Sequence, residues 1–168
     1  INGGACTTKE KFFEACENAA ILGTLQASYT DMPFLGSDTK ELIELESLIG
    51  VSITGIMDNP QVFINAETLQ AGAKIVNETN EKIAKLIGIN PAARTTTVKP
   101  SGNASVLLQT SSGIHSAHSK KYFRIVQMNK NNDVAKAIAK INPIMLENSI
   151  WNTSGTDYAI FIPIRENE

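Results

Sequence analysis

The sequence predicts an α/β fold with a mainly parallel sheet. Short runs of β-branched and apolar residues alternate along the chain with amphipathic helical segments, which are long enough to connect parallel strands. With 168 residues, of which 42% are hydrophobic and 19% charged, the chain can bury a core and has the composition of a globular protein. We therefore expect a single domain over residues 1–168, in which crossover helices cover the sheet.

The first two elements are expected to be helices. Thr7 and Glu10 have the spacing of a capping box, and apolar residues recur at helical spacing over Thr8–Ser28. After a break, Ser37 and Asp38 can cap a second helix, which has leucines on one side and glutamates mostly on the other.

A buried strand and a long helix are expected next. The strand covers Gly50–Met57, where the chain is β-rich and largely apolar, and the Asp58-Asn59-Pro60 turn should end it. The helix runs from about Ala66 to Ile87, because Asn65 is a good N-cap and Gly88 is a good stop signal.

The last part of the chain continues the alternation. The mix of aromatic and β-branched residues over Tyr122–Met128 predicts a strand. Asn132 or Asp133 can cap the helix that follows, and Pro143 closes it. A final strand is expected at about Asp157–Ile164.

The candidate site is the turn that follows a short β-branched strand expected at Thr95–Val98. Pro100 must end that strand because proline has no N–H for a ladder, and Ser101 is a good N-cap for the next helix. Free backbone N–H groups and small side chains at a helix N-terminus suit a phosphate group. The residues of this candidate phosphate site are Lys99, Pro100, Ser101, Gly102, Asn103, Ala104 and Ser105. An ordinary capped strand-to-helix turn has the same local sequence, so both interpretations stay open at this point.

Asp58 and Asn59 are expected to lie near the same turn. Ligands in open parallel sheets bind at the carboxyl ends of strands, where both segments would end. The familiar motifs of other chemistries are missing: the sequence contains no Gly-x-Ser-x-Gly elbow, no Gly-x-Gly-x-x-Gly and no nucleotide-binding Gly-Lys-Ser/Thr loop.

Histidines and cysteines do not form a recognisable metal site. His115 and His118 have i, i+3 spacing but lack a third ligand, so we expect no metal to be bound there. Cys6 and Cys16 fit neither a zinc ribbon nor a disulfide framework, and we expect both to be packed thiols.

Charge and hydropathy restrict the partners. The net charge is −2 and the basic residues are scattered, which argues against nucleic acid as a partner. No apolar run has the length of a membrane span and no signal-peptide pattern is present, so we expect no membrane partner and a cytoplasmic location. The chain does not open with methionine, which is compatible with an excised piece.

Five blocks, in order and over nearly the whole chain, together resemble the adenosylcobalamin-dependent, class II ribonucleotide reductases. These blocks are Leu22–Asp31, Leu48–Asn59, Thr95–Ser105, Ser112–His118 and Tyr122–Val126. The resemblance implies a place in a ten-stranded α/β barrel, built from two parallel five-stranded halves around a finger loop that carries the radical cysteine. The chain is similar to the C-terminal part of that barrel, its second half, downstream of the finger loop. The resemblance also implies that the Pro-Ser-Gly-x-x-Ser turn over Pro100–Ser105 holds the substrate phosphates. Asn103 stands where the family more often has threonine or serine.

The radical chemistry of the resembled family is not encoded in this stretch. Asn-Pro occurs at Asn59, Asn90 and Asn142, but no cysteine follows as in the family's Asn-Pro-Cys-Gly-Glu-type loop. The reducing cysteine pair is absent too, and Cys6 is not assigned the radical role. We therefore expect no catalytic residue in this chain and no activity from it alone.

The resemblance implies a fragment or split subunit of an enzyme that makes deoxyribonucleotides for DNA replication. Its partners would be a nucleoside di- or triphosphate, adenosylcobalamin and the remaining reductase barrel with its finger loop. An isolated half-barrel leaves apolar sheet edges uncovered, so we expect it to form homo-oligomers. The alternative is a non-enzymatic phosphate-binding or interaction domain on the same scaffold.

Overall fold

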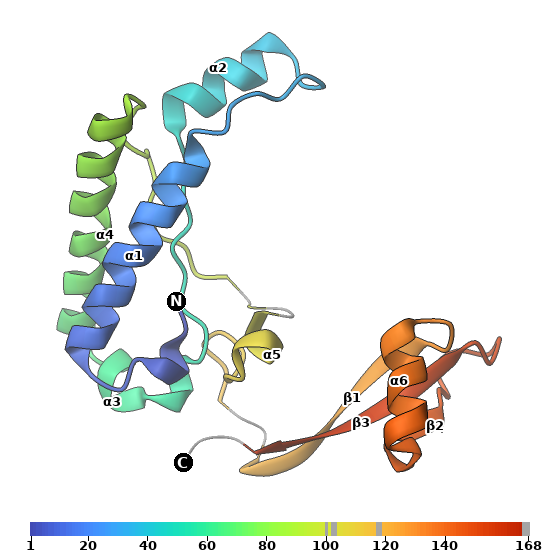
Figure 1. Ribbon diagram of the computed structural model, residues 1–168. Coiled ribbons are helices and arrows are strands. Elements are labelled where there is room, and N and C mark those ends of the chain that lie inside the picture. Colours follow the sequence, from blue (N-terminus) through green and yellow to red (C-terminus); the bar gives the residue numbers. More distant parts are fainter. Residues whose placement is uncertain (100, 102–103, 117–118, 166–168) are drawn as a thin grey trace. The chain divides into compact units, whose positions relative to one another are not determined.

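The computed structural model describes residues 1–99, 101, 104–116 and 119–165. The chain divides into two compact units, Ile1–Ala117 and His118–Glu168, which are considered one at a time below (Figure 1). The expectation of one domain over residues 1–168 stays a prediction.

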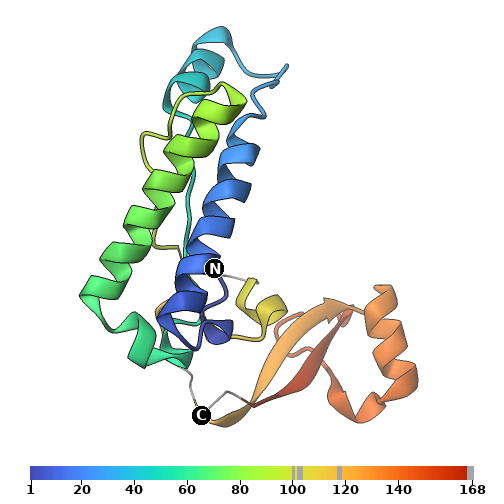
Figure 2. The same ribbon diagram turned by 60° about the vertical axis from the view of Figure 1, so that its left-hand side comes forward.

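Two long helices form the frame of the first unit. Helices α1 (Lys9–Ala27) and α4 (Ala66–Ile87) lie side by side in both views (Figures 1 and 2). Asn65 caps α4 by accepting a hydrogen bond from the Thr68 N–H at 2.9 Å, and Gly88 ends the helix at φ +77°, as expected. The α1 helix is confirmed as well, but its cap is Thr8 and not Thr7.

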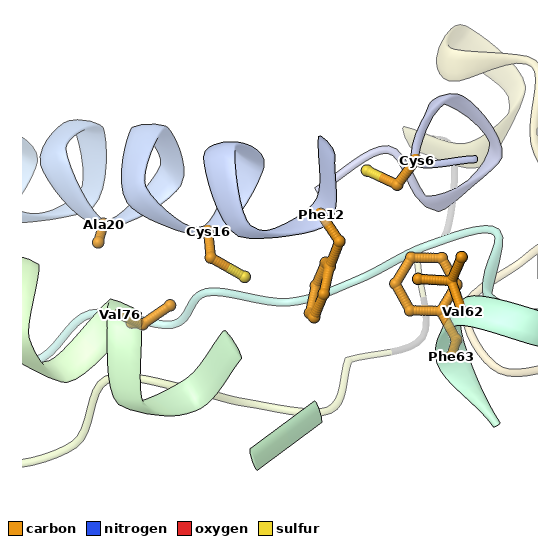
Figure 3. Close-up of a cluster of buried hydrophobic side chains, with 7 residues drawn as sticks. All are labelled: Cys6, Phe12, Cys16, Ala20, Val62, Phe63 and Val76. Carbon is orange, nitrogen blue, oxygen red and sulfur yellow. The ribbon is translucent and has the colours of Figure 1, made fainter. Parts of the chain in front are cut away.

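The hydrophobic core of this unit lies between α1, α4 and the short helix α3 (Pro60–Phe63) (Figure 3). It consists of Cys6, Phe12, Cys16, Ala20, Val62, Phe63 and Val76. Phe12 packs edge-on against Phe63, with ring centroids 5.1 Å apart. Gly72 on α4 allows the helices to approach, because a Cβ atom there would lie only 2.6 Å from the Phe12 ring.

Helix α2 (Ser37–Glu46) carries few buried contacts. Gly36 occupies its N-cap position, so Ser37 begins the helix instead of capping it. None of its residues is buried, and the predicted apolar side is open: Leu42 and Leu45 are 54% and 66% exposed.

The two strands expected in the first unit are replaced by extended segments with isolated parallel bridges. Val51 pairs with Thr96, and Asn2 pairs with Thr54. Neither pairing grows into a ladder, because the chain bends at Gly55 (φ +77°) into the 3₁₀ turn η2 (Ile56–Asp58). The predictions of strands over Gly50–Met57 and Thr95–Val98 were therefore wrong in length, although the parallel direction was right.

The Leu48–Ser52 segment is paired along one edge and only partly paired along the other. Ile49 and Val51 use one edge, through hydrogen bonds with Arg94, Thr95 and Thr97. On the other edge, Ser52 accepts from the Ile1 nitrogen, while the backbone of Gly50 and the Ser52 N–H have no hydrogen-bond partner among the described residues.

The second unit is a three-stranded antiparallel sheet with one helix. The order is β1 (Lys121–Asn129), β3 (Asp157–Arg165) and β2 (Leu146–Asn148), and Ile125 faces Phe161 in the register. Helix α6 (Asp133–Ile141) begins after its Asn132 cap, and the 3₁₀ turn η3 (Pro143–Met145) follows it.

The prediction of a mainly parallel sheet is wrong for these strands. Because β1 and β2 each run antiparallel to β3, they share one direction, as a crossover through α6 requires. However, β3 lies between them and makes every pairing antiparallel. The short β2, which no sequence pattern indicated, is what allows β3 to take the central position.

Candidate functional site

A cavity of about 640 Å³ lies beside the predicted turn in the first unit. Its walls come from the second half of α1, the segment over residues 47–52, and the start of α5 (Ala104–Leu108). Three of the predicted phosphate-site residues line it: Lys99, Ser101 and Ala104.

The predicted turn itself is described in part. Pro100, Gly102 and Asn103 lie outside the described residues. Ser101 is half-buried, and its carbonyl accepts a hydrogen bond from the Ala104 N–H at 2.9 Å. Ser105 is buried within α5. The helix is only five residues long, so its macrodipole contributes little, and an anion would depend mainly on side chains and single N–H groups.

Lys99 contributes a positive charge to the cavity wall. It is the one charged side chain among the described residues that line the cavity, and no carboxylate lines it. Within the described part of the chain, the Lys99 ammonium forms no ion pair. The wall around the predicted turn is therefore suited to an anion and not to a cation.

A hydrogen-bonded clamp, which the sequence did not indicate, holds the segment after α5. The Thr54 hydroxyl donates to the Ser111 carbonyl at 3.2 Å and accepts from the Gly113 N–H at 3.0 Å. The Asp58 carboxylate accepts from the Ser111 N–H at 3.0 Å. Between these two anchors lies Ser112, whose Oγ is 3.1 Å from Ser101 Oγ.

Asp58 and Asn59 bind backbone groups outside the Lys99–Ser105 turn. Asp58 contacts Ser111, as described above, and the Asn59 amide donates to the Gly3 and Gly4 carbonyls at 2.8 and 3.1 Å. Both side chains thus satisfy backbone groups where three segments converge. Residues 111 and 112 connect Asp58 with Ser101, through the Ser111 N–H and the Ser112 hydroxyl, and the expected meeting at one mouth stays a prediction.

His115 is not among the residues that line the cavity. His115 is exposed, and His118 lies outside the described residues. Among the residues that the structure describes, no three His, Cys, Asp or Glu side chains come together as metal ligands. The prediction that no metal is bound stays a prediction.

Cys6 and Cys16 are packed thiols, as expected. They are 4% and 2% exposed, and both are free. Burial raises the pKa of Cys16 to about 11, with the nearby Cys6 as a smaller cause, and burial also raises the pKa of Cys6. Such thiols are poor nucleophiles.

Similarity to known proteins indicates the family to which this chain is related. No family model matches the chain. The chain is 26% identical over 138 residues, 78% of its length, to a probable adenosylcobalamin-dependent ribonucleoside-triphosphate reductase of Dictyostelium discoideum. It also matches the crystal structure of a B-12 dependent (class II) ribonucleotide reductase over 92% of its length, with a TM-score of 0.72 and 18% identity. The resemblance to class II ribonucleotide reductases is confirmed.

The match covers a small part of each reductase. The chain spans 17% of the curated relative and 24% of the solved reductase chain. The fold is therefore that of a portion of a class II ribonucleotide reductase. No helix in the described ranges is both long and apolar enough to cross a membrane.

Proposed function

We propose that this chain is part of a class II ribonucleotide reductase and that its Lys99–Ser105 turn binds the substrate phosphates. One observation carries the proposal: Lys99, Ser101 and Ala104, from the Lys99–Ser105 turn, line one cavity whose only charged side chain among the described residues is cationic. The Lys99 ammonium would attract the phosphate, and the Ser101 hydroxyl would donate to it.

The remaining machinery belongs to the larger enzyme. The reaction replaces the ribose 2′-hydroxyl with hydrogen and needs a radical cysteine, whereas Cys6 and Cys16 are buried in the core. This chain would hold the nucleotide, while the rest of the barrel supplies the finger loop and the adenosylcobalamin site. The enzyme would act on a nucleoside di- or triphosphate in the cytoplasm.

The proposal is tested by measuring pyrophosphate and nucleotide binding by calorimetry. Gly102→Val should abolish binding because a β-branched side chain blocks the approach of the anion to the backbone. Ser101→Ala should weaken it about fivefold, the value of one hydrogen bond. Both variants are compared with the parent at equal folded fraction. Unchanged affinity in Gly102→Val would place the anion elsewhere.

A non-enzymatic phosphate-binding or interaction domain is the second candidate, since neither cysteine is accessible in this structure. Reconstitution distinguishes the two. If a polypeptide that bears the finger loop restores nucleotide reduction when mixed with this chain, the enzyme interpretation holds. If the complex forms and binds nucleotide without turnover, the second candidate is supported.

A further inference from the structure

Ser112 contacts the predicted phosphate turn through its side-chain hydroxyl. Its Oγ lies 3.1 Å from Ser101 Oγ, across eleven residues of sequence. Two hydroxyls at this distance share one hydrogen bond, and either oxygen can be the donor. The hydroxyl that accepts keeps its own proton for another partner.

The position of Ser112 is fixed from both sides. The Ser111 N–H is bound by Asp58 and the Ser111 carbonyl by Thr54, while the Gly113 N–H donates to the same Thr54 hydroxyl. The Gly113 carbonyl accepts from the Ile56 N–H at 3.1 Å. Thr54 is 7% exposed and also lines the cavity, so a buried hydroxyl in the cavity wall holds the backbone on both sides of Ser112.

We infer that Ser112 and Thr54 are positioning residues for anion binding at Ser101, an inference that rests on the proposed function. In the bound state Ser112 donates to Ser101 Oγ, and Ser101 therefore directs its own proton to the phosphate oxygen. A hydroxyl that already accepts a hydrogen bond is a stronger donor. Thr54 acts one step further back by holding residues 111–113 in place.

The test is a double-mutant cycle read out by titration with inorganic pyrophosphate. Ser112→Ala should weaken binding about threefold to fivefold in the parent chain, as expected for one lost hydrogen bond. In a Ser101→Ala background the same change should have no further effect, because Ser112 acts only through that hydroxyl. Ser112→Thr keeps the hydroxyl and should restore affinity.

Thr54 is tested with a matched control. Thr54→Val removes both hydrogen bonds with little change in shape, and Thr54→Ser keeps the hydroxyl. Thr24 offers the comparison: it is fully buried, and its hydroxyl donates to the Ala20 carbonyl and accepts from the Asn80 amide. Thr24→Val should lower the melting temperature without changing pyrophosphate affinity at equal folded fraction, whereas Thr54→Val should weaken binding and Thr54→Ser should preserve it.

The outcomes separate the two proposals. If the parent chain binds pyrophosphate and Gly102→Val abolishes binding, but Ser112→Ala and Thr54→Val bind as tightly as the parent, only this inference is overturned. Equal losses from Ser112→Ala in both backgrounds would also overturn it, because they would mean a general structural effect. If the parent chain does not bind pyrophosphate, the proposed phosphate site and this inference both fall.

Discussion

Cys16 lies in the centre of the core, where a charged thiolate is poorly tolerated (Figure 3). Its side chain is within reach of the Phe12 ring and of Gly72, whose added Cβ would lie 3.2 Å from the Cys16 sulfur. Because burial raises its pKa from 9.0 to about 11, the folded chain keeps the thiol proton over a range in which the unfolded chain has lost it.

The first prediction concerns the pH dependence of stability. Between about pH 9 and 11 the unfolded state binds fewer protons than the folded state at Cys16, so the free energy of unfolding should fall as pH rises. Urea unfolding of the parent and of Cys16→Ala across this range measures the effect. The variant should be less stable throughout but show a flatter slope. Parallel slopes in the two proteins would contradict the raised pKa.

The second prediction is that the histidines hold no metal. His115 is exposed, and its backbone N–H donates a hydrogen bond to the Ser112 carbonyl. The backbone at His115 is therefore held in the loop without a bound metal. Elemental analysis of the purified chain should find no stoichiometric zinc or iron. One tightly held equivalent that is lost in His115→Ala would contradict this.

At the residue scale, the sequence predicted local capping and stop residues better than it predicted contacts between distant residues. The Asn65 cap and the Gly88 stop follow from local backbone chemistry, and both were right. The clamp around Ser112 was missed because it joins Thr54 and Asp58 to residues more than fifty positions away. The spacing of residues in the sequence does not predict contacts over such a distance.

At the scale of elements, the packing of α1 on α4 depends on a small side chain at one crossing point. Gly72 lies in the middle of α4 and faces Phe12, whereas Gly23 in α1 faces Ile49 at ordinary contact distances of 3.5 Å and more. Both glycines lie in helices, but a Cβ atom would have enough space at Gly23 and too little at Gly72.

The third prediction uses this pair. Alanine is favoured over glycine in a helix by about 1 kcal/mol, so Gly23→Ala should leave stability unchanged or raise it. Gly72→Ala should lower the free energy of unfolding by about 1–3 kcal/mol, because its Cβ would overlap the Phe12 ring. Urea denaturation of both variants checks this. A stabilised Gly72→Ala would mean that the helices are less closely packed than described.

The helices were predicted well at this scale, and the sheets were not. The amphipathic pattern of α1, α4 and α6 depends on residues that are close in sequence, so it predicts a helix whichever segments pack against it. A strand exists only with neighbours, and the β-rich Gly50–Met57 run forms single bridges instead of a ladder. In the second unit, β3 takes a central place that the pattern of strands and helices could not reveal.

At the scale of the whole molecule, this chain spans about a quarter or less of the reductases that it resembles. Large apolar side chains are exposed, among them Phe34 at 99% and Leu45 at 66%. Contiguous exposed apolar patches are often interaction sites.

The fourth prediction is that the chain alone does not reduce nucleotides. With adenosylcobalamin, a dithiol and a nucleoside di- or triphosphate supplied, chromatography should detect no deoxynucleotide, because both cysteines are buried and no Asn-Pro-Cys-Gly-Glu loop is present. Turnover that disappears in Cys6→Ala or Cys16→Ala would show that a thiol has been wrongly dismissed.

The fifth prediction concerns association. Exposed leucines on α2 and open backbone edges should make the isolated chain form homo-oligomers that grow with concentration. Sedimentation velocity across a concentration series measures this, and Leu42→Glu together with Leu45→Glu should shift the distribution toward the monomer. A monomer at every concentration would contradict the expectation.

The open edge at Gly50 and Ser52 has a consequence for hydrogen exchange. Their N–H groups have no partner among the described residues, whereas those of α4 are held within a long helix. Deuterium should therefore enter these two positions early and the middle of α4 late. A polypeptide that paired with this edge would delay exchange at alternate residues of Leu48–Ser52, and the number of delayed positions would mark how far the added strand extends.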